Sequence, residues 1–184
     1  MASITLDIEY TEPRSRLTNF FRYILAIPHL IVVGALSYVA QLVTVVQWLI
    51  ILFTGKRNQG IWNFTNGVLN WQVRAITYLS MMFDAYPNFG FEGRNEPVRY
   101  GATYEAEASR LTNGLRFIWA IPAIVIAALL SIAGTVLAIV CWVAIIVTGK
   151  QPRGMFDFLL KVHRYCTRTN AYTMLLTDTY PAFE

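Results

Sequence analysis

The chain has 184 residues, of which 55% are hydrophobic and 14% are charged, whereas about 25% of the residues in a typical soluble domain are charged. The formal net charge is +4. Because the basic residues flank apolar segments, this charge argues for membrane topology and against nucleic-acid binding. The composition predicts an integral membrane protein.

The sequence contains one unit twice, at a constant offset of 94 residues and without gaps. Aligning residues 4–90 with 98–184 gives 28 identities in 87 positions. The identities form blocks: 15–19 with 109–113, 26–28 with 120–122, 54–56 with 148–150, and Asp84, Tyr86, Pro87 and Phe89 with Asp178, Tyr180, Pro181 and Phe183. A unit of this length indicates a duplicated domain. We assign residues 1–93 to repeat 1 and residues 94–184 to repeat 2, with the same organisation in both.

Each unit opens with a short stretch in which apolar and polar residues alternate. Ile4, Leu6 and Ile8 share one face, and the stretch 98–104 keeps the same period of two. This alternation is typical of a half-buried strand. Because a lone strand leaves its backbone hydrogen-bonding groups unsatisfied, we expect the strands near residues 4–10 and 98–104 to pair with each other.

A long uncharged run follows in each unit. Residues 23–53 and 117–147 contain no Asp, Glu, Lys or Arg over 31 positions, well beyond the ~18 apolar residues that mark a transmembrane candidate. We expect a helix to begin near the serine of the Ser-Arg-Leu-Thr block, which is a suitable N-cap. Pro28 and Pro122 lie inside this helix and predict a kink, because proline removes a backbone hydrogen bond.

The sequence leaves the number of membrane crossings open. One straight helix of 31 residues would be ~46 Å long, against a hydrocarbon core of ~30 Å. Each run has basic residues at both ends, so a single crossing would leave one basic cluster outside, against the positive-inside rule. We therefore favour a hairpin in each repeat, with helices at about 16–37 and 40–56 in the first, although 37–41 is a poor turn signal.

The hairpins give four membrane helices, and so four crossings, in total. The alternative is one crossing in each repeat, which gives two. They make the repeats parallel and place both termini and the linker 90–100 in the cytoplasm. The segment before Arg14 also lacks the apolar core of a signal peptide. The expected fold class is an all-α membrane protein with minor β structure. Each repeat has a short strand, a transmembrane helical hairpin and an amphipathic interfacial helix.

The segments 59–83 and 153–177 predict the amphipathic helices. In repeat 1, polar residues recur every three or four positions from Asn63 to Thr77, and apolar and aromatic residues cover much of the rest. A one-sided helix with aromatic residues and cations is typical of the membrane interface. The alternative is a helix that packs on the strand pair.

Candidate catalytic and metal-binding residues are scarce. His29 lies beside the kink proline but has Ala123 as its counterpart, so we expect it to have a structural role, bonding the carbonyl group that the proline frees. His163 is expected on a solvated face. Cys141 and Cys166 belong to one repeat and predict neither a disulfide nor a metal site. We expect no metal, no cofactor and no enzymatic activity.

The charges that both repeats retain form the candidate site. They are typical of a cytoplasmic cluster that contacts anionic phospholipid headgroups. The set is Arg16, Arg22, Lys56, Arg74 and Asp84 in repeat 1, and Arg110, Arg116, Lys150, Arg168 and Asp178 in repeat 2. An alternative that is compatible with lipid contact is that Asp84 pairs with one of the arginines and fixes the last turn of the unit.

The ordered blocks Ser-Arg-Leu-Thr, Ala-Ile-Pro, Thr-Gly-Lys and Asp-x-Tyr-Pro-x-Phe resemble a bacterial membrane family known as domain of unknown function 4389. The resemblance covers essentially the whole chain, once per repeat. The chain departs from the family after Thr-Gly-Lys, where the usual Tyr-Pro-x-Gly reads Arg57-Asn58-Gln59-Gly60. The resemblance implies a bacterial membrane protein and supplies no activity that could be carried over to this chain. With the topology above, the expected location is the bacterial inner membrane, as a multi-pass protein.

The chain is small, duplicated and without catalytic groups. These features favour a non-enzymatic accessory or scaffold subunit that docks on a larger membrane assembly. Its expected partners are membrane lipids, anionic ones included, and a protein of that assembly, with no nucleic acid. The alternative is a small transporter, channel or lipid-handling protein with a path at the repeat interface. A groove lined by Gln41, Thr44 and Gln47 would favour that alternative, and a dry interface of Leu, Val and Ile would count against it.

Overall fold

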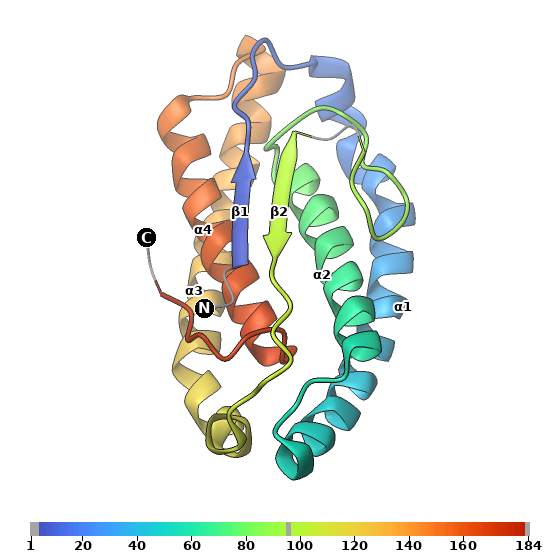
Figure 1. The fold of residues 1–184 in the computed structure, drawn as a ribbon. Helices are drawn as coiled ribbons and strands as arrows, with labels where there is room; N and C mark the ends of the chain where they lie inside the picture. Colours follow the sequence, from blue (N-terminus) through green and yellow to red (C-terminus); the bar gives the residue numbers. More distant parts are fainter. Residues whose placement is uncertain (1–3, 95–96, 183–184) are drawn as a thin grey trace.

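The computed structural model describes residues 4–94 and 97–182 and contains four helices and two strands in that part of the chain. Their order is β1 (Ile4–Ile8), α1 (Arg16–Thr54), α2 (Gln59–Leu79), β2 (Val98–Ala102), α3 (Arg110–Thr148) and α4 (Arg153–Thr173). Each repeat contributes a strand, a long helix and a shorter helix (Figure 1).

The elements form three layers (Figure 1). The strand pair packs on α2 and α4, and these helices pack in turn on α1 and α3, which also contact each other. The core lies between the layers, where Ile4, Leu6 and Ile8 of β1 join Phe156 and Leu160 of α4 in one buried cluster. The side chains of the long helices that face away from α2 and α4 therefore lie outside this core.

The predicted pairing of the two strands is confirmed. β1 and β2 form an antiparallel pair in which Ile4 lies opposite Ala102 and Ile8 lies opposite Val98. Buried and exposed residues alternate along β1, as expected. Each strand packs on the shorter helix of the other repeat, β1 on α4 and β2 on α2. Each repeat therefore supplies a strand to the core of the other.

The predicted hairpins are wrong, because α1 and α3 are each one continuous helix of 39 residues. The segment 37–41 does not turn. The hydroxyl groups of Ser37 and Thr44 donate to carbonyl oxygens four residues earlier, at 2.7 Å each, and so bond to their own helix. Residues 35–54 contain no proline or glycine that would end a helix, and the helices also continue through Pro28 and Pro122.

Both ends of the long helices follow signals in the sequence. The side chains of Ser15 and Ser109 cap α1 and α3 by accepting from the backbone N–H three residues later, at 3.2 Å each. Gly55 and Gly149 end the helices in the left-handed conformation, with φ of 71° and 73°. Glycine adopts this conformation without a steric penalty.

The repeats are antiparallel, so the predicted parallel arrangement, which rested on the hairpins, is also wrong. The indole N–H of Trp48 near the end of α1 donates to the carbonyl oxygen of Asn113 near the start of α3, at 2.9 Å. Trp142 and Asn19 make the equivalent contact at the other end, also at 2.9 Å. The long helices therefore run side by side in opposite directions, and a pseudo-two-fold axis relates the repeats (Figure 1).

The shorter helices pack under the strands, which was the alternative to an interfacial position. More than half of the residues of α2 are buried. Its polar stripe binds neighbouring segments: Asn66 accepts from the hydroxyl of Tyr100 in β2, and Asn70 donates to the loop before β2. In α4, Arg164 donates to the carbonyl oxygen of Leu6. The polar stripes, which predicted contact with lipid headgroups, instead bind loops and strands of the same chain.

Candidate functional site

Arg22 and Asp84 form a buried clamp in repeat 1. The Arg22 guanidinium donates to the carbonyl oxygens of Tyr78 and Phe83, at 2.6 Å each, and to Asp84 at 2.6 Å. Asp84 also accepts from the backbone N–H of Ser15 at 2.6 Å. The clamp joins the start of α1 to the end of α2 and to the turn that follows it.

Repeat 2 contains the same clamp with one more cation. Arg116 donates to the carbonyl oxygens of Tyr172 and Thr177, at 2.5 and 2.8 Å, and to Asp178 at 2.5 Å. Arg57, in the loop after α1, donates to the same carboxylate oxygen at 2.5 Å. Asp178 therefore holds two arginines, one from each repeat, and the ion pairs that the sequence offered as an alternative role for these aspartates are present.

The clamp arginines are buried inside the fold, with their charge committed to the chain itself. Two further members of the predicted cluster also bind their own chain. Arg74 is buried and donates to the carbonyl oxygens of Asn88 and Gly90, and Arg168 donates to that of Ala182. These arginines fix the segments that follow the shorter helices.

The other four cations of the predicted cluster are exposed at the ends of the long helices. We call them the corner cations: Arg16, Lys56, Arg110 and Lys150. The side chain of Arg16 lies beside Gly149 at the end of α3, and that of Arg110 lies beside Gly55 at the end of α1. Each end of the helix pair thus carries two exposed cations at a helix C-terminus, where the helix dipole favours positive charge.

The outer surface of α1 and α3 is apolar along its whole length, and we call it the apolar face. Only 17% of the most apolar 18-residue window of each helix is buried. Its large exposed side chains include Phe20, Ile24, Ile31, Leu42 and Phe53 in α1 and Leu111, Ile118, Leu129, Ile132 and Val147 in α3. By length and composition, both helices are able to cross a membrane. A contiguous apolar surface of this extent marks a contact site for lipid or protein.

The layer of strands and α4 carries charge, and we call its outer surface the charged face. Its exposed charged residues include Asp7, Arg99, Arg153, Asp157 and Lys161. Arg153 pairs with Asp157 at 3.1 Å and Arg164 pairs with Asp7 at 2.8 Å. Because α4 lies along α3, the charged face extends beside the apolar face and not beyond its end (Figure 1).

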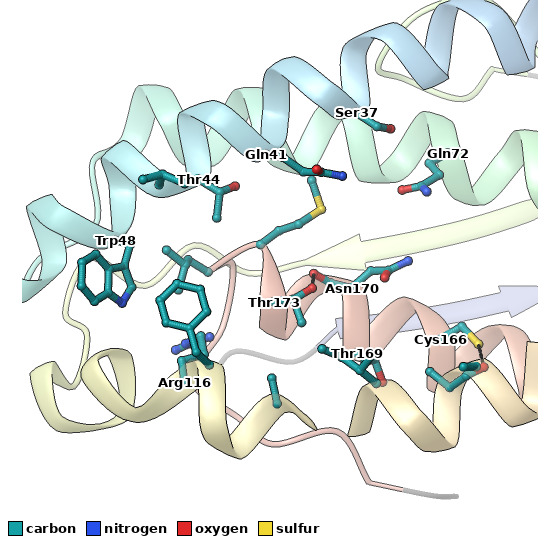
Figure 2. Close-up of a pocket in the computed structure, with 18 of the residues that line it drawn as sticks. Ser37, Gln41, Thr44, Trp48, Gln72, Arg116, Cys166, Thr169, Asn170 and Thr173 are labelled. Carbon is teal, nitrogen blue, oxygen red and sulfur yellow. Dashed lines mark hydrogen bonds between the residues drawn. The ribbon is translucent and has the colours of Figure 1, made fainter. Parts of the chain in front are cut away.

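A partly open cavity of about 660 Å³, the interface cavity, lies between the repeats. Residues of α1, α3 and α4 line it, together with Gln72 of α2 (Figure 2). Trp48, Phe117 and Ile124 contribute apolar walls. The polar groups in its lining include those of Gln41, Thr44, Gln72, Ser131, Asn170 and Thr173. A volume of this size is within the range of small-molecule sites.

The interface cavity contains two of the three groove residues that the sequence singled out. Gln41 and Thr44 line it, whereas Gln47 is buried elsewhere and accepts from the backbone N–H of Asn58 at 3.2 Å. Asn170 and Thr173 were missed. Their signal in the sequence is a set of small uncharged polar residues on the side of α4 opposite its charged stripe, at helical spacing.

His29 lies in an aromatic cage that only repeat 1 can form. Its Nδ1 accepts from the indole N–H of Trp71 at 3.1 Å. Its ring stacks on that of Phe89, with centroids 4.1 Å apart, and lies 4.9 Å from that of Tyr86. The structure thus shows this histidine bonded to Trp71, whereas the prediction named the carbonyl group that Pro28 frees. The counterpart Ala123 has no side chain that could form such a cage.

His163 does not lie on a solvated face, so that prediction is wrong. Its side chain is half-buried, and within the described part of the chain its Nε2 is buried without a hydrogen-bond partner. Desolvation lowers the pKa of His163 to about 4. The cause is its place in the layer under the strands, where the counterpart Leu69 is fully buried.

Neither cysteine forms a disulfide within the described residues, and burial raises the pKa of the Cys166 thiol. The same part of the chain contains no group of three or more His, Cys, Asp and Glu side chains placed to hold a metal ion.

The fold is therefore that of a two-repeat helical protein with an apolar helix pair, a strand-exchanged core and a cavity between the repeats. The chain belongs to the family described as Domain of unknown function (DUF4389), whose model matches it twice, over residues 16–91 and 110–184. The two matches confirm the tandem duplication. No curated protein and no solved structure matches the chain.

Proposed function

We propose that the chain is a non-enzymatic membrane scaffold that lies in the plane of one leaflet, with the apolar face in the hydrocarbon and the charged face in water. The observation that supports this most directly is the placement of the two faces on opposite layers of the same molecule, each along the length of the helices. The proposal replaces the multi-pass topology with a one-sided insertion and keeps the cytoplasmic side of a bacterial inner membrane as the location.

The lengths and charges disfavour a perpendicular orientation. α1 has 39 residues and is therefore about 58 Å long, nearly twice the ~30 Å thickness of the hydrocarbon core. If α3 crossed the bilayer, α4 would enter it as well, and each exposed charge such as Asp157 or Lys161 would cost about 2.5–3.5 kcal/mol near the bilayer centre. An in-plane orientation leaves these charges in water.

The corner cations also favour an in-plane orientation. They stand at both ends of both long helices, so a crossing would leave two of the four on the outer side. In the plane of one leaflet, all four reach the headgroups of the same membrane surface. Each then contributes about 1 kcal/mol of attraction to an anionic surface. The conflict with the positive-inside rule, which led to the prediction of hairpins, does not arise.

The charged face is the proposed docking surface for a protein of a larger membrane assembly. Its exposed side chains carry both signs, as Asp7 and Lys161 show. Both strands are edge strands of a two-stranded sheet, so each has backbone groups on its outer side that are able to pair with an added strand. A partner bound there would sit on the aqueous side, parallel to the membrane.

Cysteine labelling in intact cells tests the orientation. In a variant without the two native cysteines, Thr11→Cys reports on one end of α1 and Lys56→Cys on the other; both positions are exposed. We expect an impermeant thiol reagent to label neither in intact cells and both after permeabilisation. Labelling of one end alone in intact cells would indicate a crossing and would overturn the in-plane proposal.

Vesicle flotation tests the contact with anionic lipid. We expect the protein to associate more strongly with vesicles that contain phosphatidylglycerol than with phosphatidylcholine alone. Replacing all four corner cations by glutamine should remove most of this preference, since each contributes about 1 kcal/mol. The matched control replaces Arg99, Arg153 and Lys161 of the charged face and should leave the preference intact; equal losses would refute the assignment of faces.

The second candidate function is lipid handling, from the class of the transporter alternative. The observation that favours it is the interface cavity, which is lined by Gln41 and Thr44. An in-plane orientation provides no path across the bilayer, so it does not fit a transporter or a channel. It is compatible with a lipid-handling protein. Selective binding of a membrane amphiphile in the cavity is the experiment that separates this candidate from a scaffold alone.

A further inference from the structure

The interface cavity has a position that suits a molecule from the membrane. Its borders are α1 and α3, and the outer surfaces of the same two helices form the apolar face. A hydrocarbon chain that lies against the apolar face therefore needs to pass only between these helices to reach the cavity. Phe117, Ile124 and Val45 in the lining provide an apolar wall for such a chain.

Three side-chain amides give the cavity unused hydrogen-bonding capacity. Gln41 comes from α1, Gln72 from α2 and Asn170 from α4, and Figure 2 shows them around the same part of the cavity. Within the described part of the chain these three amide groups make no hydrogen bond, whereas the hydroxyl of Thr44 is bonded to its own helix. Each amide has two donors and a carbonyl acceptor, so a ligand with hydroxyl or carbonyl oxygens would satisfy them.

The charges of the lining exclude an ionic headgroup. Among the described residues that line the cavity, Arg116 is the charged one. Its guanidinium is committed to Asp178 and to two carbonyl oxygens, and its side chain is 4% exposed. A carboxylate or phosphate would have to compete with Asp178 for this cation or lose its hydration without an ion pair. A neutral headgroup has no such requirement.

We propose that the interface cavity binds one neutral amphiphile of the membrane, with a hydroxyl- or carbonyl-bearing headgroup at Gln41, Gln72 and Asn170 and its hydrocarbon chain along the apolar wall. This inference rests on the proposed insertion of the apolar face, which brings the cavity to the depth of the lipid chains. It names the class of ligand for the lipid-handling function. The three side-chain amides select the headgroup of that ligand by hydrogen bonds alone.

Two alanines of α3 supply a matched pair of variants for the test. Ala128 lines the cavity, whereas Ala133 is exposed, is not part of the lining and lies on the other side of the helix. Ala128→Phe therefore fills the cavity, and Ala133→Phe adds the same ring on the apolar face. For the amides, Gln41→Leu is matched by Thr135→Leu, since Thr135 is the exposed counterpart of Gln41 outside the cavity lining.

The experiment measures binding of 1-oleoylglycerol and of oleate to the detergent-solubilised protein by native mass spectrometry. We expect one saturable 1-oleoylglycerol per chain and weaker binding of oleate. Ala128→Phe and Gln41→Leu should each weaken binding of 1-oleoylglycerol by about tenfold. Ala133→Phe and Thr135→Leu should leave it unchanged. The melting temperature of each variant establishes that a loss of binding is not a loss of folding.

The outcomes separate this inference from the proposed orientation. Unsaturable binding, or equal binding by the wild type and the folded Ala128→Phe variant, would overturn the assignment of the cavity. Oleate that binds as tightly as 1-oleoylglycerol would overturn the neutral headgroup. Saturable, Ala128-dependent binding in detergent together with labelling of one end of α1 in intact cells would support the ligand site and reject the in-plane orientation.

Discussion

The two repeats keep the same aspartate but surround it differently. In repeat 1, Asp84 accepts from Arg22 at 2.6 Å and from the side-chain amide of Asn19 at 2.9 Å. In repeat 2, Asp178 accepts from Arg116 and from Arg57, each at 2.5 Å. The arginine of the long helix is therefore common to both clamps, and the second donor is an amide in one and a guanidinium in the other.

The part of the clamp that the fold requires is the arginine of the long helix. In both halves the retained arginine also binds two carbonyl oxygens, one at the end of the shorter helix and one in the turn after it. These carbonyl groups need donors wherever the unit occurs. The second donor to the aspartate is free to vary, because the carboxylate has two oxygens and several lone pairs to fill.

Removing the aspartates should have the largest effect on the free energy of unfolding. Asp178→Ala leaves two buried arginines without their carboxylate, and we expect it to lower the free energy of unfolding by about 3 kcal/mol. Asp84→Ala leaves one and should cost about 2 kcal/mol, since the second side-chain partner of this carboxylate is the neutral amide of Asn19. Denaturant titration in detergent measures both losses; a larger loss for Asp84→Ala would show that Arg57 contributes little.

The aromatic cage of His29 is a part of repeat 1 that has no counterpart in repeat 2, and substitutions in it should therefore affect repeat 1 alone. His29→Ala removes the acceptor of the Trp71 indole and a ring stacked on Phe89, so we expect a loss of about 2 kcal/mol. A double-mutant cycle with Trp71→Phe should give a coupling of about 1 kcal/mol. Strict additivity of the two substitutions would contradict the hydrogen bond.

His163, whose counterpart in repeat 1 is Leu69, should make the stability of the fold depend on pH. The pKa of His163 is lowered to about 4 in the folded chain from 6.5 in the unfolded one, so the unfolded state binds the proton first as the pH falls. The stability associated with the neutral ring is fully present above pH 6.5 and is lost as the pH falls toward about 4. His163→Leu, which copies the counterpart Leu69, should flatten this part of the stability profile; an unchanged profile would assign the pH dependence to other groups.

The smallest effect is expected at Asp7, whose counterpart is Gly101. The carboxylate pairs with Arg164 at 2.8 Å, but the two side chains are 58% and 33% exposed. Exposed ion pairs contribute about 0.2–1 kcal/mol, so Asp7→Ala should change the free energy of unfolding by about 0.5 kcal/mol or less. The substitution is the reference for the clamp variants, and a loss as large as that of Asp84→Ala would remove the distinction between buried and exposed carboxylates.

Local features of the fold could be predicted from the sequence where the signal is short-range. The alternation of Ile4, Leu6 and Ile8 predicted a strand, and the need of that strand for a partner identified β2. Ser15 predicted the start of α1, because an N-cap acts within one helical turn. The retained Asp84 suggested an ion pair with one of the arginines, because a carboxylate among arginines needs one, and the structure shows that this arginine is Arg22.

The direction of the repeats and the continuity of the helices could not be predicted in the same way. The hairpins followed from a charge rule that assumes a crossing, and that rule is silent about a helix that lies flat. Uncharged polar residues such as Ser37 and Thr44 are compatible with a turn, a helix–helix contact or a bond to their own helix. The interface cavity depends on how α1, α3 and α4 pack together across the repeats, which no pattern within one repeat contains.

The exchange of strands and the crossed Trp–Asn contacts have a consequence for the origin of the chain. A polypeptide with a single copy of the unit satisfies its strand and its long helix only by associating with a second copy, as a two-fold symmetric homodimer. Fusion of two such copies makes that association intramolecular and independent of protein concentration. It also releases the copies from identity, so that one fused chain is able to carry a histidine cage in one half, a second arginine in the other, and a cavity with unequal walls between them.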